Sequence, residues 1–252
     1  MGAQTSPALP VPTRRQRLRE QTQNEIKAAA RAQLVSNGPG GVQLRAVARD
    51  VGLTAPALYR YFPSLEELVE ALTVDLFDEL CDVMEGAAAP AADPFARMLE
   101  LSRAFRRWAM QHPHEFGLLF ASPPTALGQQ PTNACQQASD RFGNLFASAF
   151  IAIWDAAPFP VPADDEVEPA MTAGLMPYRT WLVANVAPDM PLGAVVRFLE
   201  GWVRIFGCVA MDAFGHLSWA MPDGEPMFEQ VMSSLAEMVG RPDAYVPPKA
   251  SV

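Results

Sequence analysis

Two short helical patterns separated by a single glycine occupy residues 43–62, and they constrain the fold more than any other feature of the chain. The first helix is expected over about 44–51, because its apolar residues fall on one face, and Gly52 ends it. Thr54 is a candidate N-cap for the second helix, which is expected over about 55–61. Two short helices joined by such a tight turn are typical of a helix-turn-helix.

A longer helix is predicted in front of this motif. No Gly or Pro interrupts the chain between Thr13 and Asn37, and apolar residues recur there at helical spacing. Gly38 suits the left-handed backbone position that follows many helices, and Pro39 cannot continue a helix, so the first helix ends here. The three helices together predict a small N-terminal module.

The charged residues divide the chain at the same place. Residues 13–62 contain nine basic and three acidic groups, a net charge of +6. Residues 63–252 contain 10 basic and 25 acidic groups, a net charge of −15, and the two parts add up to the −9 of the whole chain. Such an asymmetry indicates a small module for a polyanion attached to an acidic body, with a solvated charged helix face as the alternative.

The run QLRAVARDVGLTAPALYRYFPSLEELVEAL resembles the DNA-binding region of the TetR family of bacterial transcriptional regulators, and the likeness extends over roughly residues 14–85. The resemblance implies an all-α chain. It implies an N-terminal three-helix helix-turn-helix DNA-binding domain, linked by a fourth helix to an α-helical ligand-binding and dimerisation domain. The expected divisions are a disordered leader over 1–13, the DNA-binding domain over 14–62, the helical body over 63–245 and a tail over 246–252.

The resemblance also implies which side chains meet DNA. Thr54 caps its helix onto a phosphate, and the hydroxyls of Tyr59 and Tyr61 hydrogen-bond phosphate oxygens, contacts that position a protein without reading sequence. Simple packing is the alternative for the two tyrosines. The full predicted set is Gln43, Arg45, Thr54, Ala55, Pro56, Ala57, Tyr59, Arg60, Tyr61 and Ser64.

Few side chains are expected to recognise the base sequence of the DNA. Ala55, Pro56 and Ala57 lie nearest the base edges by the resemblance, and such apolar groups can meet thymine methyls but offer no hydrogen-bond code. Arg45 can reach a phosphate or bind a guanine edge with two hydrogen bonds. Specificity is therefore expected to come from Arg45, Arg60 and DNA shape.

One position departs from the family pattern. Many members have a phosphate-binding lysine near the start of the fourth helix, as in FxxKEEL, whereas this chain has Leu65 in FPSLEEL. Ser64 still offers an N-cap. An arm from Arg14 to Arg19, which contains four arginines, is expected to replace the charge by lying along phosphates or entering the minor groove. A solvated arm without DNA contact is the alternative.

The body shows helical patterns and no convincing strand alternation. A fourth helix is expected over about 64–85, followed by an Ala/Pro/Gly-rich joint over 86–92. Prolines punctuate the ends of the helices that follow. These are expected near 93–111, 113–121, 134–156, 165–186, 191–218 and 225–239.

The helix expected near 191–218 is apolar nearly all round, so it must be buried on more than one side. Its polar stripe consists of Arg197, Glu200, Arg204, Asp212 and His216. The family resemblance implies a homodimer through this helix and the one near 225–239. Three glycines permit close approach there: Gly201, Gly207 and Gly215.

The resemblance further implies a largely apolar effector pocket among the aromatic residues of the body. An effector that prefers the non-binding spacing of the two DNA heads would lower operator affinity. Possible polar handles are Tyr178, Arg179, Trp181 and Asn185. The candidate pocket residues are Trp108, Phe116, Phe120, Phe150, Trp154, Tyr178 and Trp181.

Other chemistry finds no support in the sequence. No GxSxG elbow, HExxH helix or dinucleotide-binding fingerprint occurs, so neither an enzyme nor a cofactor is predicted. His112 and His114 fit a helix-end role better than a metal site, because the chain has only three histidines. Its three cysteines are far apart and form no CxxC pair, which favours a reducing, cytoplasmic location.

The chain is accordingly expected to be a repressor that binds a palindromic operator in double-stranded DNA as a dimer and is released by a small apolar effector. No stretch qualifies as a membrane span, and nucleoid association is expected only with DNA bound. The alternative is an α-helical small-molecule-binding protein or enzyme whose DNA-binding head is vestigial. An activator, or a regulator without a ligand, also fits the sequence.

Overall fold

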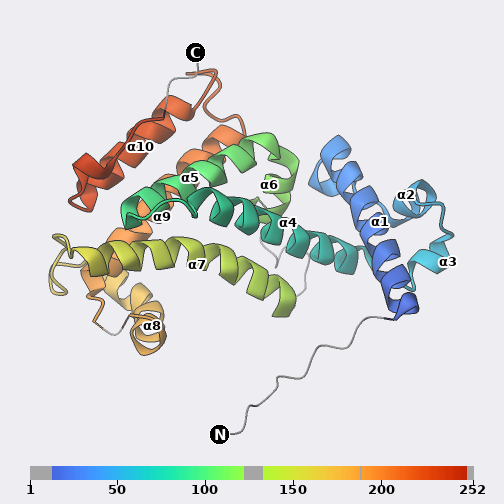
Figure 1. Ribbon diagram of the computed structural model, residues 1–252, viewed down its shortest axis with the longest axis horizontal. Helices are drawn as coiled ribbons and strands as arrows, with labels where there is room; N and C mark the ends of the chain where they lie inside the picture. The colour runs from blue at the N-terminus through green and yellow to red at the C-terminus, as the bar shows by residue number, and fades with distance from the viewer. Residues whose placement is uncertain (1–12, 122–132, 188, 249–252) are drawn as a thin grey trace, which may run out of the picture. The chain divides into compact units, whose positions relative to one another are not determined.

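The computed structural model describes residues 13–121, 133–187 and 189–248, and all regular elements in these ranges are helical (Figure 1). The predicted leader lies outside them except for Thr13, as does the end of the predicted tail. The α-helices are α1 (Arg14–Asn37), α2 (Leu44–Asp50), α3 (Ala55–Leu58), α4 (Leu65–Ala88), α5 (Pro94–Gln111), α6 (Pro113–Phe120), α7 (Asn133–Ala156), α8 (Pro169–Asn185), α9 (Leu192–Ala213) and α10 (Glu225–Met238). Short 3₁₀ turns cover Pro39–Gly41 and Pro242–Ala244.

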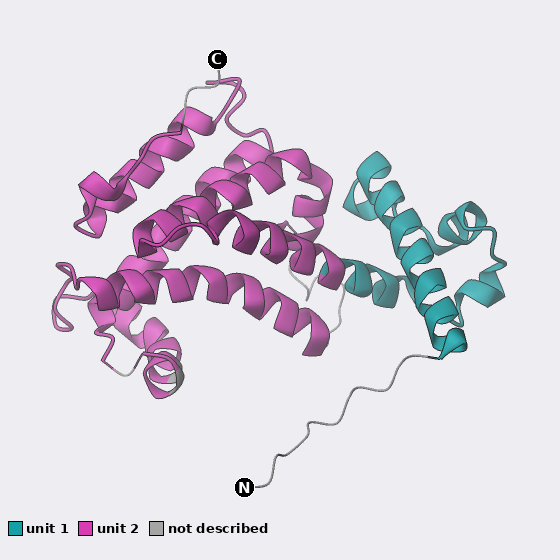
Figure 2. Cartoon of the chain, viewed as in Figure 1, with its two compact units in different colours: residues 1–73 teal, residues 74–252 magenta. Residues whose placement is uncertain are grey.

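Two compact units divide the chain between Thr73 and Val74, inside α4 (Figure 2). The charge pattern placed this boundary at residue 62 instead. The first turns of α4 belong to the N-terminal unit, and they bury Leu68 and Leu72 completely or nearly so. A helix that contributes core residues to one unit and continues into the next cannot be assigned to either by charge alone.

The core of the N-terminal unit comes from the spacing of apolar residues in α1. Ile26, Ala30 and Leu34 recur every four residues and are fully buried, and α1 packs on α2, which packs on α3. Val47 of α2 and Leu58 of α3 complete this core with almost no exposed surface. Burial of one face of each short helix therefore holds the module together.

The predicted arginine arm, Arg14 to Arg19, forms the first turns of α1, the long first helix that the sequence predicts. Thr13 starts the helix with a capping box: its hydroxyl accepts from the backbone N–H of Gln16 at 3.3 Å, and its own N–H donates to the Gln16 side chain at 2.7 Å. No residue after Thr13 breaks the helix before Gly38, which has φ 76°. The arginines are thus held on the faces of a helix.

In the C-terminal unit, α5 is the central helix. It packs against α7 and α9, while α8 and α10 pack against α9. Side chains on several faces of α5 are buried, among them Phe95, Leu101, Phe105 and Trp108. A helix covered on more than one side is the middle of a helical domain rather than its surface.

Three helix ends differ from the sequence expectations. The predicted joint begins too early, because Gly86 lies inside α4 and helix continues to Ala88. In contrast, α8 begins only at Pro169. Helix α9 ends at Ala213 because Gly215 takes φ 72°, and residues 214–220 form turns. His216 therefore lies beyond the helix whose polar stripe it was predicted to join.

Ion pairs, two of them largely buried, tie α5 to α9 and to the segment that contains α10. Arg106 Nη2 donates to Asp212 Oδ2 at 2.7 Å and to Asp223 Oδ1 at 2.8 Å. One turn away, Arg103 Nη2 donates to Glu229 Oε2 at 2.7 Å. Asp223 also accepts from the backbone N–H of Glu225, and that bond together with Arg106 lowers its pKa. These arginines therefore hold the end of α9 and the first half of α10 against α5.

None of the helices in the described part of the chain is both long enough and apolar enough to cross a lipid bilayer.

Candidate functional site

The turn between α2 and α3 depends on the backbone of one glycine. Gly52 has φ 68°, a left-handed conformation that L-residues rarely adopt. The N–H of Gly52 donates to the carbonyl of Arg49 at 3.1 Å, and the N–H of Leu53 donates to that of Ala48 at 2.8 Å. These two bonds close the end of α2 and direct the chain into α3.

Replacing Gly52 with alanine is expected to lower the free energy of opening of the N-terminal unit by about 1 to 2 kcal/mol, because a Cβ disfavours the left-handed backbone. A steric clash is not the cause, since no atom lies within 4 Å of a Cβ added at Gly52. Hydrogen exchange of peptides from residues 14–62 measures the effect. Gly40→Ala is the matched control, with equally open space and no left-handed φ, and equal protection of both variants would contradict the explanation.

The start of α3 is capped as the sequence predicts. Thr54 Oγ1 accepts from the backbone N–H of Ala57 at 3.4 Å. Regular helix ends at Leu58, earlier than expected, and Tyr59 to Tyr61 lie in the turns that follow. The chain stays compact there, because the N–H of Phe62 donates to the carbonyl of Leu58 at 3.0 Å.

The structure leaves the predicted DNA-binding residues accessible. Gln43, Arg45, Thr54, Pro56, Tyr59 and Arg60 are exposed, and Ala55, Ala57, Tyr61 and Ser64 are half-buried. Tyr59 keeps 47% of its surface free, which is more than a packing role needs. The guanidinium of Arg19 lies 6.0 Å from the ring centre of Tyr61, so the basic start of α1 is close to the end of α3. That the ten predicted residues contact DNA stays a prediction.

Two polar residues support this surface. Gln33 of α1 accepts from the backbone N–H of Gln43 at 3.1 Å and donates to Asp50 Oδ2 at 2.8 Å, so one side chain holds both ends of α2. Sequence reasoning missed Gln33, because nothing in its neighbours distinguishes it from a solvated polar residue. Ser64 Oγ accepts from the N–H of Glu67 at 3.1 Å and caps α4 as expected.

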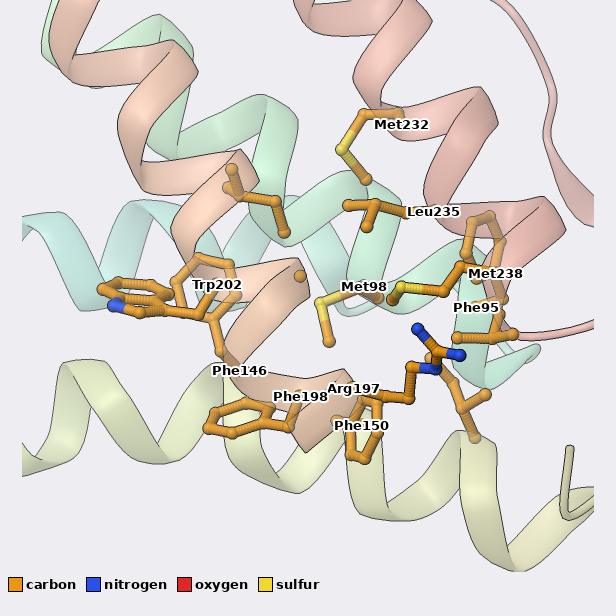
Figure 3. A pocket seen from close by; sticks show the side chains of 14 residues that line it. Phe95, Met98, Phe146, Phe150, Arg197, Phe198, Trp202, Met232, Leu235 and Met238 are labelled. Atoms are coloured by element: carbon orange, nitrogen blue, oxygen red, sulfur yellow. The ribbon is translucent and has the colours of Figure 1, made fainter. Parts of the chain in front are cut away.

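A narrow apolar cavity of about 40 Å³ lies in the C-terminal unit (Figure 3). Side chains of α5, α7 and α9 and of the segment around α10 surround it. They are Phe95, Met98, Phe146, Phe150, Ile153, Arg197, Phe198, Gly201, Trp202, Ile205, Met232, Leu235, Met238 and Val239.

Of the predicted pocket residues whose side chains the structure describes, Phe150 alone lines this cavity. Phe116 and Phe120 pack around Phe105, with ring centres 5.9 and 5.8 Å from it. Trp108 is buried, and its indole N–H donates to Glu79 at 3.1 Å. These three residues therefore belong to the packed core between α5 and its neighbours.

Trp154 of α7 and Tyr178 of α8 do not line this cavity. Trp154 packs edge-on against Phe159 at 5.2 Å. Tyr178 borders a second space of about 10 Å³, and burial raises the pKa of its phenol. The side chains of Trp181 and Asn185 lie outside the described residues.

The histidines considered as metal ligands are placed at a helix junction. His112 precedes α6 and stacks on Trp108 with ring centres 4.9 Å apart, and its Nδ1 lies 3.0 Å from the Trp108 carbonyl oxygen. Among residues 13–121, 133–187 and 189–248, no cluster of three side chains has the arrangement that could hold a metal ion.

A basic three-helix head with a glycine turn and an exposed tyrosine, followed by a helical body, defines the class of helix-turn-helix transcriptional regulators. Residues 26–72 match the family model "Bacterial regulatory proteins, tetR family", and residues 98–235 match "Tetracyclin repressor-like, C-terminal domain". The chain belongs to the TetR family of transcriptional regulators. Members of this family are regulators and not enzymes.

Curated relatives are similar over most of their length. The HTH-type transcriptional regulator Rv1816 of Mycobacterium tuberculosis is 32% identical over 163 residues, which are 61% of this chain and 70% of that protein. The regulator Mb1846 of Mycobacterium bovis matches with the same identity and coverage.

Solved structures share the fold. The crystal structure of SCO4313 matches with a TM-score of 0.69 and 27% identity, covering 89% of this chain and all of that one. A protein of unknown function from Rhodococcus sp. RHA1 matches with a TM-score of 0.61 and 18% identity, covering 87% and 93%. RolR, solved in complex with resorcinol, has a TM-score of 0.51 and 13% identity, covering 92% and 98%.

Proposed function

We propose that this protein is a repressor that binds a palindromic operator as a homodimer and is released by a small, largely apolar effector. The observation that carries the DNA-binding part is the exposed surface of α2 and α3. Arg45 of α2, and Tyr59 and Arg60 in the turns after α3, are exposed, and residues 13–62 have a net charge of +6. Such a surface satisfies the two requirements of operator binding, phosphate attraction and access of side chains to base edges.

The exposed face of α9 supports the homodimer. Val203 is 67% exposed and Met211 is 46% exposed, and both lie on the same face as Gly207, whose Cβ position has no neighbour within 4 Å. Residues four apart on a helix share a face, so these three form one apolar strip. Trp219, in the turns after α9, is 86% exposed. Exposed apolar groups of this size are typical of an interface.

The apolar cavity supports the effector. It lies beside α9 and α10, the same helices that we propose to form the dimer, so an occupant can bias the spacing of two DNA heads. RolR, which shares the fold, was solved with the small aromatic molecule resorcinol. Release then requires only that the effector binds the non-binding spacing more tightly than the binding one.

Selection of binding sites from random duplex DNA with the purified protein tests the function. We expect an inverted repeat whose half-sites lie about 10 base pairs apart or a multiple of that distance. Arg45→Ala is expected to relax the preference at one base pair, whereas Tyr59→Phe should weaken all sites equally. Recovery of no sequence, or of single unrepeated sites only, would favour the vestigial head.

Val203→Arg is expected to raise the dimer dissociation constant roughly 100-fold, because an apolar interface cannot pair the new charge and its symmetry mate repels it. Sedimentation velocity measures the dimer, and a gel shift measures the accompanying loss of operator affinity. The matched control is Val83→Arg, at a position of α4 that is 45% exposed. An unchanged dimer with arginine at position 203 would place the interface elsewhere.

A further inference from the structure

The apolar cavity of the C-terminal unit contains one charged group. Of the residues that line it in the described part of the chain, only Arg197 is ionised, and the others are apolar side chains and one glycine. Figure 3 shows the Arg197 side chain extending from α9 into the space that Met98 and Met238 also border. A cationic head beside an apolar cavity is the arrangement that recognises an amphipathic anion.

The hydrogen bonds of Arg197 are incomplete. Its Nη1 donates to Glu200 Oε2 at 2.7 Å, a bond within α9 between side chains that are 30% and 38% exposed. Its Nε is buried and has no hydrogen-bond partner. A buried donor without an acceptor is unfavourable, and a guanidinium can bind a second carboxylate through the fork of its nitrogens. The missing partner is therefore an acceptor, best an anionic one.

The lining also suits a flexible apolar chain. A cavity of about 40 Å³ holds little more than one water molecule, so an occupant must widen it. Met98, Met232 and Met238 can move aside, because methionine is unbranched and adapts to irregular shapes. Gly201 has no side chain, and a Cβ added there would lie 3.7 Å from Leu235 and from Met238. A slender alkyl chain needs the least widening of any apolar group.

We propose that the effector is an aliphatic monocarboxylate. Its carboxylate accepts from Arg197 Nε, and its alkyl chain lies between α5, α7, α9 and α10. That this binding alters DNA affinity rests on the proposed ligand-released function, whereas the binding itself does not. Insertion between α9 and α10 displaces α9, the helix that carries the proposed dimer strip, which connects the cavity to the spacing of the heads.

Titration of the full chain with decanoate and with decanol tests the proposal. Trp202 lines the cavity, so tryptophan fluorescence reports its occupation. We expect decanoate to bind at least tenfold more tightly than decanol. Arg197→Met should remove that difference and leave decanol affinity unchanged. Arg107→Met, at an exposed position of α5, removes the same charge elsewhere and should change neither affinity.

Two further variants keep the test decisive if Arg197→Met fails to fold. Arg197→Lys retains the charge but lacks the planar fork, so decanoate should bind at least threefold more weakly. Gly201→Leu fills the cavity and should abolish binding of both molecules. Equal affinity for decanoate and decanol, or decanoate affinity unchanged by both Arg197 variants, would overturn the proposal.

A gel shift with the selected operator distinguishes failure of the proposed ligand class from failure of the proposed ligand-released function. If decanoate binds through Arg197 but never alters operator affinity, the ligand class is supported and effector release is wrong. If decanoate does not bind while another molecule releases the operator, the proposed function is supported and the carboxylate is overturned.

Discussion

Replacing Arg106 with methionine is expected to lower the free energy of unfolding of the C-terminal unit by about 3 to 5 kcal/mol, because Asp212 is left as an uncompensated buried charge. The Arg106 and Asp212 side chains are 11% and 9% exposed, and their atoms are 2.7 Å apart. Methionine keeps much of the packing against Phe228, whose ring centre lies 5.9 Å from the guanidinium carbon. The cost is therefore expected to come from the lost charge.

Unfolding in urea followed by tryptophan fluorescence measures this loss in the right unit. All five tryptophans lie between residues 74 and 252, so the signal does not report the N-terminal unit. The matched control is Arg107→Met, next in the chain but exposed, which is expected to change stability by about 0.5 kcal/mol or less.

A double variant separates the buried charge from a general loss of packing. Asp212→Leu combined with Arg106→Met should recover most of the stability, because removing both partners leaves no buried charge. If the double variant is less stable than Arg106→Met alone, packing and not the charge explains the effect.

The turn after α2 and the starts of α3 and α4 were predictable because their signals are local. Gly52 takes φ 68°, and the hydroxyls of Thr54 and Ser64 each accept from a backbone N–H three residues further on. Each signal depends only on residues within one helical turn. The exposed set on α2 and α3 follows from the same local pattern.

The polar stripe predicted on the ninth helix shows where local reasoning ends. Arg197 does pair with Glu200 on the same helix, but Asp212 turns inward to Arg106, far away in the sequence. Gly224 lies so close to the Asp212 carboxylate that a Cβ there would clash. Nothing in one helix specifies which neighbour will supply a countercharge, so a stripe that looks solvated can contain a buried pair.

The cavity could not be located from the sequence for a related reason. An abundance of aromatic residues predicts a core, and Phe105, Phe116 and Phe120 indeed pack closely with one another. A cavity forms where the side-chain volumes of several helices fail to fill the space between them. The position of the cavity depends on Met98 and Gly201 as much as on any aromatic side chain, and it depends on which helices meet there.

The helical start of α1 separates its arginines into faces, which makes their roles testable. Arg15 and Arg19 are four residues apart and share a face, and Arg19 lies over Tyr61. Arg17 is two residues from Arg19, roughly 200° around the helix, and so points away from Tyr61. If Tyr61 faces the operator, Arg15 and Arg19 lie along the phosphates of the DNA and Arg17 does not.

Arg15→Gln combined with Arg19→Gln is therefore expected to lower the salt dependence of operator binding. Each lost phosphate contact reduces the slope of log affinity against log salt by about 0.9, so two in each subunit of a dimer reduce it by roughly 3.6. Glutamine preserves the helix, because its helix propensity is close to that of arginine. Fluorescence anisotropy with a labelled operator at four salt concentrations measures the slope.

Arg17→Gln removes one charge from the same turns of α1 and should leave the slope nearly unchanged. The comparison is informative because each replacement on α1 is arginine to glutamine, so the face decides any difference beyond the number of charges removed. If Arg17→Gln lowers the slope as much as either Arg15→Gln or Arg19→Gln does alone, the arginines act as a diffuse positive charge, and the proposed orientation of α1 on DNA is wrong.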